Sequence, residues 1–598
     1  MTIASDRARP EIGLERAVER AAGRLLELQH PEGWWVGELE SNATMIAQHL
    51  FWHHFLGLRT PELDRKVAAE LLARQREDGT WAIWFEGPAD LSTTIEAYVA
   101  LKLAGAEPGA LARDYIRSQG GLPRARIFTK CFLALLGHWP WQLIPRLPPE
   151  TILVPANRFF SVYSFSCWAR QTLVALSVVQ ALRPVRPARI ELREIGARPG
   201  STKPPPRPGP LRRLALSAAE RWVRERQEAD GSWGGIQPPW VWSILMLAAL
   251  GHGFEDAALR RAVEGWRGFT IDEGDRLRPE ACQSPVWDTA LVVLALREAG
   301  VAADHPQLRR AGAWLLGEEV TVRGDWALRR PELPPGGWAF EFENDRYPDI
   351  DDTAVVVLAL RSLGLEGGAV ERGLAWTAGM QSRGGGWGAF DADNEAHWLY
   401  KLPFCDFGKV TDEPSADVTA HALEALAPVA RYAQEVEHGL DWLLAEQEAD
   451  GSWFGRWGVN HLYGTGAALP ALEACGLPSD DPAIRRAAGW LRSVQQPDGG
   501  FGEDIRSYAD PRWRGRGPAT PSQTAWALLG YVAAGEAGSE AAARAANWLC
   551  LRQRATGDWD EEHYTGTGFP LDFMIRYHLY RLHFPLLALG RLRERLSG

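Results

Sequence analysis

The sequence predicts an all-α fold made of two barrels of helical hairpins. The main support is a pattern that recurs seven times: an amphipathic helix is followed by Gln, by Gly four residues later, and by an aromatic residue two positions further on. The repeat glutamines are Gln29, Gln75, Gln227, Gln381, Gln447, Gln495 and Gln553. Seven copies indicate a repeat protein, and a spacing of about 50 to 65 residues in the C-terminal half leaves room for one hairpin per repeat.

The repeat residues have expected structural roles. Segments 221–226 and 440–444 suit helices with one apolar face, and each precedes a repeat glutamine. We expect the glycine to end the helix, the glutamine amide to reach terminal backbone groups, and the aromatic ring to stack on the next repeat. The unusual total of 28 Trp is therefore interpreted mainly as a set of structural clamps.

The repeats fall into two groups, which predicts two barrels. The N-terminal group ends at Trp233 and the C-terminal group begins at Gln381. Helical hairpins that repeat and close on themselves form an α/α barrel. A Pro/Arg-rich tract between Arg183 and Pro210 interrupts the first group, and it is predicted to be a surface loop or partly disordered.

Composition argues against several classes of function. A net charge of -11, without a basic patch that has interleaved aromatics, disfavours a nucleic-acid partner. Six scattered cysteines without a CxxC pair predict neither a zinc knuckle nor a disulfide framework, and a reducing cytosol fits. The N-terminus lacks the apolar region of a signal peptide. No run of about 18 or more apolar residues predicts a transmembrane helix.

The stretch 347–354 contains three carboxylates, Asp349, Asp351 and Asp352, and an apolar run follows at once. Pro348 and Asp349 predict a helix start, with Asp352 three residues in. One interpretation is an acid-rich helix N-cap, since anionic side chains are favoured at that end. The other is a proton donor, because three carboxyls this close cannot all ionise cheaply and at least one keeps its proton. A protonated carboxyl facing a dry cavity can protonate a weak base such as an alkene.

A second motif places Asp417 and His421 four residues apart, on one face of a predicted helix. A histidine that is kept cationic by Asp417 and hydrogen-bonded to the second oxygen of the acid would help that acid to release its proton. Taken alone, the motif fits equally an Asp–His pair on a helix surface. Together with the acidic stretch, it favours an acid site.

A third feature is a set of aromatic residues outside the repeats. Phe569, Phe573, Tyr577 and Tyr580 are spaced 4, 4 and 3 apart, which predicts one aromatic stripe on a helix. A core stripe is one interpretation. The preceding segment 565–568, Thr-Gly-Thr-Gly, favours a second one, in which the stripe meets a cavity and stabilises cations through its ring faces.

These motifs resemble those of the squalene–hopene cyclases, the bacterial class II triterpene cyclases. The segment Asp349-Ile350-Asp351-Asp352-Thr353-Ala354 matches the DxDDTA signature of that family, and the seven repeats resemble its QW motifs. Further matching blocks are residues 231–239, 284–289, 403–408 and 454–460. The resemblance extends from about Gly33 to Arg591.

The resemblance implies an α6–α6 barrel formed by residues 283–598 together with 1–17, and a second α-barrel at 18–282 that contains the loop at about 183–213. The resemblance also implies a hydrophobic cavity between the two barrels. The implied activity is metal-independent cyclisation of a linear polyprene, squalene above all, to hopene or hopanol. The carbocation cascade would end by deprotonation or water capture, and no cofactor is implied.

The same resemblance implies roles for single residues. Asp351 would donate the proton, Asp349 and Asp352 would be anionic flankers, and His421, supported by Asp417, would tune Asp351. Tyr463 would help to return a proton from solvent. Residues implied to stabilise cations or shape the cavity are Phe340, Phe569, Phe573, Trp168, Trp287, Trp457, Tyr577 and Tyr580. Residues implied to hold the terminating water are Gln237 and Glu96, and those implied to line the substrate channel are Phe165, Phe404 and Cys405.

The chain departs from the family pattern at three places. Phe390 stands where a tyrosine is usual, and Ile46 stands where an acid is usual. The apolar stretch that dips into the membrane in relatives is replaced by the shorter Pro/Arg-rich tract. The resemblance therefore implies peripheral contact with the cytoplasmic side of a membrane, without the usual attachment element, although a basic tract can touch anionic lipid. A homodimer is a further expectation.

The same residues bear on three other enzyme classes and on non-enzymatic functions. An inverting glycosidase also uses paired carboxylates, but the apolar run behind the acids favours a hydrophobic substrate. A class I terpene synthase needs a DDxxD magnesium site, and residues 351–355 lack the last acid. A protein prenyltransferase subunit needs an Asp/Cys/His zinc site, for which no convincing set exists. A cyclase of another linear terpenoid and a non-enzymatic α/α toroid remain as alternatives.

Overall fold

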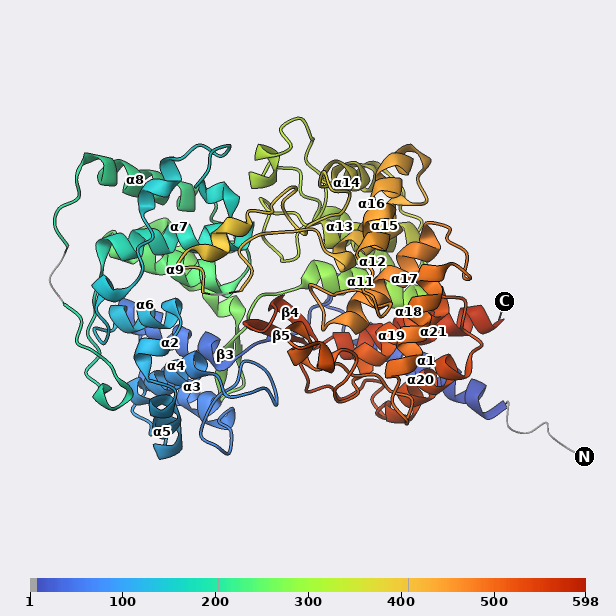
Figure 1. Cartoon of the computed structure of the whole chain (residues 1–598), viewed down its shortest axis with the longest axis horizontal. Coiled ribbons are helices and arrows are strands. Elements are labelled where there is room, and N and C mark those ends of the chain that lie inside the picture. Colours follow the sequence, from blue (N-terminus) through green and yellow to red (C-terminus); the bar gives the residue numbers. More distant parts are fainter. Residues whose placement is uncertain (1–7, 202–204, 407, 598) are drawn as a thin grey trace, which may run out of the picture.

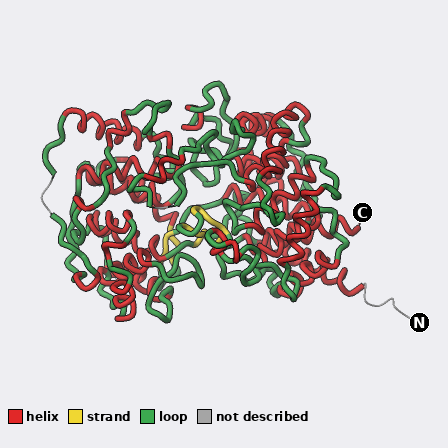
Figure 2. Tube along the Cα trace, in the orientation of Figure 1, coloured by secondary structure: helices red, strands yellow, loops and turns green. Residues whose placement is uncertain are grey.

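The computed structural model describes residues 8–201, 205–406 and 408–597. The described chain is mainly helical and forms two lobes, with short strands lying between them (Figures 1 and 2). Helix α1 and the α-helices from α11 onward form one lobe, while the α-helices from α2 to α10 form the other (Figure 1). The predicted all-α fold is thus confirmed.

The C-terminal lobe is a closed double ring of helices. Each inner helix contacts the next one, and the last inner helix returns to the first. In ring order, the inner helices are α11 (Pro285–Glu298), α13 (Ile350–Ser362), α15 (Ala416–Leu426), α17 (His461–Ala474), α19 (Pro521–Ala533) and α21 (Tyr580–Ser597). Their outer partners are α12 (Pro306–Gly317), α14 (Gly368–Gly379), α16 (Ala433–Ala445), α18 (Pro482–Val494), α20 (Glu540–Arg552) and α1 (Ala8–Glu27). This is an α6–α6 barrel.

Helix α1 bears on the predicted domain boundary. It packs against α20, α21 and α11, and the Gln553 side chain donates to the carbonyl of Ala17 inside it. The boundary predicted between residues 17 and 18 therefore falls within a single helix that belongs to the C-terminal ring. The rest of the domain division stays a prediction.

The N-terminal lobe is less regular. Its inner helices are α2 (Ala43–Leu56), α4 (Leu91–Leu103), α6 (Ile127–Leu135), α7 (Cys167–Leu182) and α9 (Gln237–Ala249). Contacts join α7 to α9, α9 to α2, and α2 to α4, while α6 touches both α4 and α2. The outer helices are α3 (Pro61–Ala73), α5 (Ala110–Ser118), α8 (Pro210–Arg224) and α10 (Ala257–Gly265).

Each repeat is a hydrogen-bonded clamp between neighbouring hairpins. In one copy, the Gln447 amide donates to the carbonyls of Gly451 and of Ala483 in α18, both at 2.9 Å. The indole of Trp453 donates back to the carbonyl of Leu443, the third-last residue of α16, at 2.7 Å. Equivalent glutamine pairs recur in all seven copies. The prediction that the glutamine reaches backbone groups at helix ends is confirmed.

The expected role of the repeat glycine is wrong. Helix α16 ends at Ala445, before Gln447, and Gly451 lies in the turn that follows, with φ of 99°. A Cβ atom there would come within 2.6 Å of the Arg486 carbonyl oxygen in the next outer helix. Glycine is therefore required because the turn is left-handed and touches the neighbouring repeat.

The predicted aromatic stripe is not helical. Strands β4 (Gly566–Phe569) and β5 (Phe573–Tyr577) form an antiparallel hairpin, and β1 (Leu39–Glu40) pairs with the far edge of β5. Only Tyr580 lies in a helix, at the start of α21. Helix formation is blocked before β5 because Pro570 lacks an N–H and Leu571 adopts φ of 69°. A second, two-stranded sheet pairs β2 (Thr270–Asp272) with β3 (Leu277–Pro279).

The Pro/Arg-rich tract is largely non-helical, as predicted, but it is not wholly a surface loop. Leu192 and Ile195 are buried, and a short 3-10 turn, η5, spans Arg193–Ile195. Helix α8 begins at Pro210, so residues 210–213 of the predicted loop are helical. Residues 202–204 of the tract lie outside the described part. Among the described helices, none has the length and apolarity needed to cross a membrane.

Candidate active site

A cavity lies between the two lobes and draws its lining from both of them. Predicted site residues that line it are Asp349, Asp351, Asp352, Tyr463, Glu96, Trp168, Trp287, Phe340, Phe390, Trp457, Phe569, Phe573, Tyr577 and Tyr580. Its lining is mainly apolar, but carboxyl groups are present at Asp349, Asp351 and Asp352 and also at Glu96. The structure thus brings most of the predicted residues to one space.

The acidic stretch begins helix α13, as predicted. Asp349 is the N-cap residue, and its Oδ1 accepts a hydrogen bond from the backbone N–H of Asp352 at 2.6 Å. Asp351, in the first turn, is buried and lines the cavity. Its Oδ1 lies 2.5 Å from Nδ1 of His421 on the neighbouring inner helix α15. The predicted hydrogen bond between the acid and the histidine is therefore present.

Burial controls the protonation of the flanking acids. Loss of hydration raises the pKa of Asp349 to about 7. Burial, followed by the charge of Asp349, raises the pKa of Asp352 well above its ordinary value. Both effects favour the protonated form. The resemblance implied anionic flankers, whereas these two carboxyls lie in an environment that favours holding protons.

His421 is favoured as the imidazolium. Burial by itself would lower its pKa, but the charge of Asp351 and the hydrogen bond to it dominate and raise the pKa to about 9. The charges of Glu424 and then Asp417 also raise this pKa, after the two effects of Asp351. The Oδ2 of Asp417 accepts the backbone N–H groups of Arg456 at 2.8 Å and Trp457 at 2.7 Å. Asp417 therefore holds the loop that carries Trp457, and it acts on His421 only through its charge.

Several site residues occupy equivalent places in successive repeats. In five of the seven repeats a threonine hydroxyl accepts the backbone N–H of the repeat aromatic. Thr353 does the same for Trp338, which lies outside the seven repeats, at 2.9 Å. Asp351 lies two residues before Thr353, in the first turn of the inner helix α13. The corresponding residues of α11, α15 and α17 are Trp287, Asp417 and Tyr463. Four consecutive inner helices of the ring thus place a site residue at the same position, in their first turn.

Aromatic rings cover the walls of the cavity. The Trp168 ring lies 5.6 Å from Phe390, 5.9 Å from Trp457 and 6.2 Å from Phe569, as centroid distances. Phe569 and Phe573, from the two strands of the hairpin, are 5.9 Å apart. These distances are typical of interacting aromatic pairs.

A second aromatic group lies on the side of the acids. Tyr577 and Tyr580 are stacked with centroids 4.2 Å apart, and Phe340 meets Tyr577 edge-on at 6.3 Å. The Trp287 indole donates to the Tyr580 hydroxyl at 3.0 Å. Ring faces of this kind stabilise positive charge without acting as nucleophiles.

A polar cluster lies in the N-terminal lobe. Glu96 accepts hydrogen bonds from Gln48 at 2.9 Å and from Thr129 at 2.5 Å. Gln237 donates to Gln48 at 3.2 Å, and its own Oε1 is buried without a partner among the described residues. Burial raises the pKa of Glu96 to about 7. Sequence reasoning found Glu96 and Gln237 and missed Gln48 and Thr129, which belong to no motif.

Two of the three predicted channel residues line the same cavity. Phe165 and Phe404 line a second, smaller cavity, with ring centroids 6.5 Å apart. Phe160 and Trp398 also line it. Cys405 lines neither of these two cavities.

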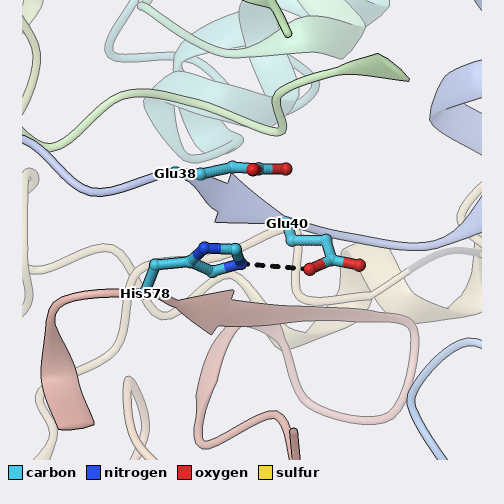
Figure 3. Close-up of side chains that lie close together, drawn as sticks. All are labelled: Glu38, Glu40 and His578. Carbon is cyan, nitrogen blue, oxygen red and sulfur yellow. Dashed lines mark hydrogen bonds and ion pairs between the residues drawn. The ribbon is translucent and has the colours of Figure 1, made fainter. Parts of the chain in front are cut away.

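Three potential metal ligands meet away from the central cavity. Glu38, Glu40 and His578 come from the β1 and β5 region, and His578 bonds to Glu40 at 3.0 Å (Figure 3). Arginines already neutralise both carboxylates: Arg278 binds Glu38 at 2.6 Å, and Arg74 binds Glu40 at 2.9 Å. The donor set therefore fits an ion-pair cluster better than a divalent cation.

Glu341 is another residue that sequence reasoning missed. It is buried, lines the cavity next to Phe340, and its Oε2 accepts from the Asn344 amide at 2.9 Å. Burial raises its pKa well above the ordinary value. The only sequence signal was an acid directly after the Gly-Gly-Trp-Ala-Phe block.

Comparisons with known proteins agree with this geometry. The squalene-hopene cyclase C-terminal domain matches residues 283–594, and the N-terminal domain matches 18–207 and 201–275. The chain is 46% identical to the squalene–hopene cyclase of Alicyclobacillus acidocaldarius, over 97% of this chain and 98% of that protein. It is 41% identical to that of Zymomonas mobilis, over 97% and 95%.

One further sequence relative and one solved structure are similar to this chain. The dammaradiene synthase of Dryopteris crassirhizoma is 38% identical, over 98% of this chain and 94% of that protein. The solved structure of ent-copalyl diphosphate synthase from Streptomyces platensis superposes with a TM-score of 0.54 at 19% identity, covering 97% and 99%, and supports the fold alone. With both family domains matched and full-length relatives above 40% identity, the chain belongs to the squalene–hopene cyclase family.

Proposed function

We propose that the protein is a class II cyclase that folds and cyclises a linear polyprene, with squalene as the substrate and hopene or hopanol as the product. The observation that carries this proposal is the Asp351–His421 pair at an aromatic-lined cavity. A carboxyl group that is hydrogen-bonded to an imidazolium and faces apolar walls has the properties needed to protonate an alkene.

In the proposed first step, Asp351 transfers its proton to the terminal alkene of the substrate. The π electrons form the new C–H bond, leaving a tertiary cation on the substrate and a carboxylate on Asp351. The His421 imidazolium stabilises that carboxylate through the hydrogen bond to Oδ1. Asp349 and Asp352, in the same stretch and also lining the cavity, place further carboxyl oxygens near the new cation.

Ring closure then moves the positive charge along the cavity. Each closure uses the next alkene as the nucleophile, so the enzyme supplies shape and charge stabilisation. The faces of Trp168, Phe569 and Phe573 provide stabilisation where water would quench the cation. Holding the flexible chain in one folded conformer also removes much of the entropic barrier.

The reaction is proposed to end at the polar cluster of Gln48, Glu96 and Gln237. Their hydrogen-bonded side chains can position a water molecule that captures the last cation or removes a proton from it. The two outcomes give an alcohol or an alkene. Tyr463, which lines the cavity with its ring centroid 6.4 Å from that of His421, is retained as a candidate for proton return.

Peripheral membrane contact on the cytoplasmic side is the proposed route of substrate delivery. Phe159 and Phe160 are 64% and 51% exposed, and both rings contact Trp398, which lines the second cavity with Phe160. Leu211 and Leu214 are also exposed, on α8. Apolar side chains of this kind at a cavity mouth suit a lipid surface. The predicted homodimer remains a prediction.

The test is incubation of the purified protein with squalene in detergent, followed by product identification by mass spectrometry. Hopene or hopanol is the expected product. Conversion of a different linear polyprene, with squalene untouched, would keep the chemistry and replace the substrate. Because one relative is a dammaradiene synthase, dammaradiene is the second product to look for. Binding without turnover of any polyprene would instead favour a non-enzymatic toroid.

A further inference from the structure

Each proposed turnover leaves Asp351 without its proton, and Asp351 is buried. A proton must therefore return from solvent before the next substrate can react. The product gives up one proton at the end of the cascade, either directly to a base or from the captured water, so the overall reaction is balanced as an isomerisation or a hydration. The open question is which groups carry the returning proton.

We propose that Glu341 returns protons from the exposed Asp230 side of the protein to the buried carboxyls of Asp349 and Asp352, which reload Asp351. This inference rests on the proposed function, because it assigns the step that follows each protonation of substrate. It adds a proton-return route to the candidate Tyr463.

The side chain of Glu341 occupies a space built for it. Gly235, from the N-terminal lobe, has φ of 59°, and a Cβ atom there would lie 2.1 Å from Cγ of Glu341. Asn344 fixes Oε2 from the other side at 2.9 Å. The neighbouring Gly234 likewise admits the amide of Gln171, which would lie 2.6 Å from a Cβ atom there. Polar side chains are thus gathered at one wall of an otherwise apolar cavity.

Hydrogen-bond acceptors at this wall lack donors. Asp352 Oδ1, Asn344 Oδ1 and Gln171 Oε1 are buried with no partner among the described residues, and all three residues line the cavity together with Glu341. Each residue is at least nine-tenths buried. Buried acceptors of this kind are satisfied by a protonated carboxyl or by a bridging water. Both are components of a proton-transfer chain.

Glu341 interacts electrostatically with the buried acids on one side and with an exposed acid on the other. The charges of buried Asp349 and of exposed Asp230 both act on it, and its own charge acts on Asp352. Its charge also raises the pKa of the Cys167 and Cys282 thiols, although burial is the larger cause for both.

On the outer side, the carboxyl of Glu228 is buried with Oε1 unpartnered, close enough to Asp230 and Asp345 to feel their charges. Exposed Asp230 and Asp345, half-buried Glu343 and buried Glu228 therefore surround the outer end of the route. The charge of Asp230 thus reaches Glu341 from the outer side, and the charge of Glu341 reaches Asp352 on the inner side.

The experiment measures how fast the Asp351 proton exchanges with solvent. Enzyme equilibrated in D₂O is diluted into H₂O, and after a variable delay excess enzyme converts substrate in a single turnover. Deuterium in the product reports the fraction of acid not yet exchanged. In Glu341→Gln we expect deuterium to be retained at least about tenfold longer than in wild type, with first-turnover yield unchanged and steady-state turnover reduced. Glu341→Asp should restore most of the exchange rate.

Controls separate this role from structural and competing roles. Glu332→Gln changes an exposed acid of the same loop that lies outside both the cavity lining and the outer group of carboxyls, and it should exchange as wild type does. Tyr463→Phe tests the other candidate. Wild-type exchange in Glu341→Gln would overturn the proposal, and so would an equal loss of first-turnover yield and steady-state rate. Failure of the proposed function would show differently, as an inactive wild type or an active Asp351→Asn variant.

Discussion

His421 Nδ1 lies 2.5 Å from Asp351 Oδ1, and the two residues come from adjacent inner helices of the barrel. The contact commits one carboxyl oxygen to the imidazolium and leaves the other for the proton that faces the cavity. Because helix packing in the closed ring sets the distance between α13 and α15, the acid and its partner are positioned by the fold itself.

Asp351→Asn should abolish cyclisation while leaving the fold intact. The amide has nearly the same shape but no acidic proton to transfer, so the expected rate loss is many orders of magnitude. Product formation from squalene and the melting temperature measured on the same preparation check this prediction. Retention of even a few per cent of wild-type turnover would show that Asp351 is not the acid.

The rate should fall as pH rises through about 9, where His421 loses its proton. The His421 pKa is raised from 6.5 to about 9 in the folded protein. Its contribution to stability is therefore fully present below about pH 6.5 and is lost as pH rises through about 9. The full shift corresponds to about 3 kcal/mol.

Melting curves from pH 6 to 10 for wild type and His421→Gln measure this contribution. The difference in melting temperature between wild type and His421→Gln should be largest near pH 6 and should become smaller towards pH 10. A difference in melting temperature that stays constant over this range would show that His421 does not titrate between pH 6 and 10.

The sequence predicted the parts of the fold that local patterns encode. Seven repeats marked the clamps, and the acidic N-cap marked the start of α13, because caps and repeats are read from neighbouring residues. The hairpin of Phe569 and Phe573 was mistaken for a helix. Its aromatic spacing fits a helix, but the pairing of β5 with β1 is set by residues from the other end of the chain.

From the sequence, site residues could be predicted only where they belong to a recognisable motif. Asp351 and His421 belong to such motifs. Glu341 does not, because its environment comes from Gly235 and Gln171 in the other lobe, and no local pattern predicts which residues face each other across a cavity.

Activity should survive dialysis against EDTA. One oxygen of the Asp351 carboxyl group is already hydrogen-bonded to His421, and the positive charge of the imidazolium repels a divalent cation. Initial rates before and after dialysis, with and without added magnesium, check this prediction. A loss of activity that magnesium restores would place the chemistry with the class I cyclases.

Gln447→Leu should destabilise the protein by about 1–3 kcal/mol without changing its products. The substitution removes the donor shared by the carbonyls of Gly451 and Ala483 and leaves both groups short of a partner. Thermal unfolding measures the effect. Gln119→Leu, at an exposed glutamine outside the repeats, is the matched control and should shift stability by less than about 0.5 kcal/mol.

Phe569→Ala and Phe573→Ala should give products with fewer rings while initiation continues. Asp351 and His421 are untouched, so the first cation still forms, but the growing cation loses one ring face worth about 2 kcal/mol when desolvated. Since about 1.4 kcal/mol is a factor of ten in a rate ratio, deprotonation can then compete with the next ring closure. Product profiles by mass spectrometry, compared with melting temperatures of the same variants, test this. Ordinary core aromatics would instead cost about 3–5 kcal/mol of stability, and an unchanged product ratio with a sharply lowered melting temperature would reject the catalytic role of the hairpin.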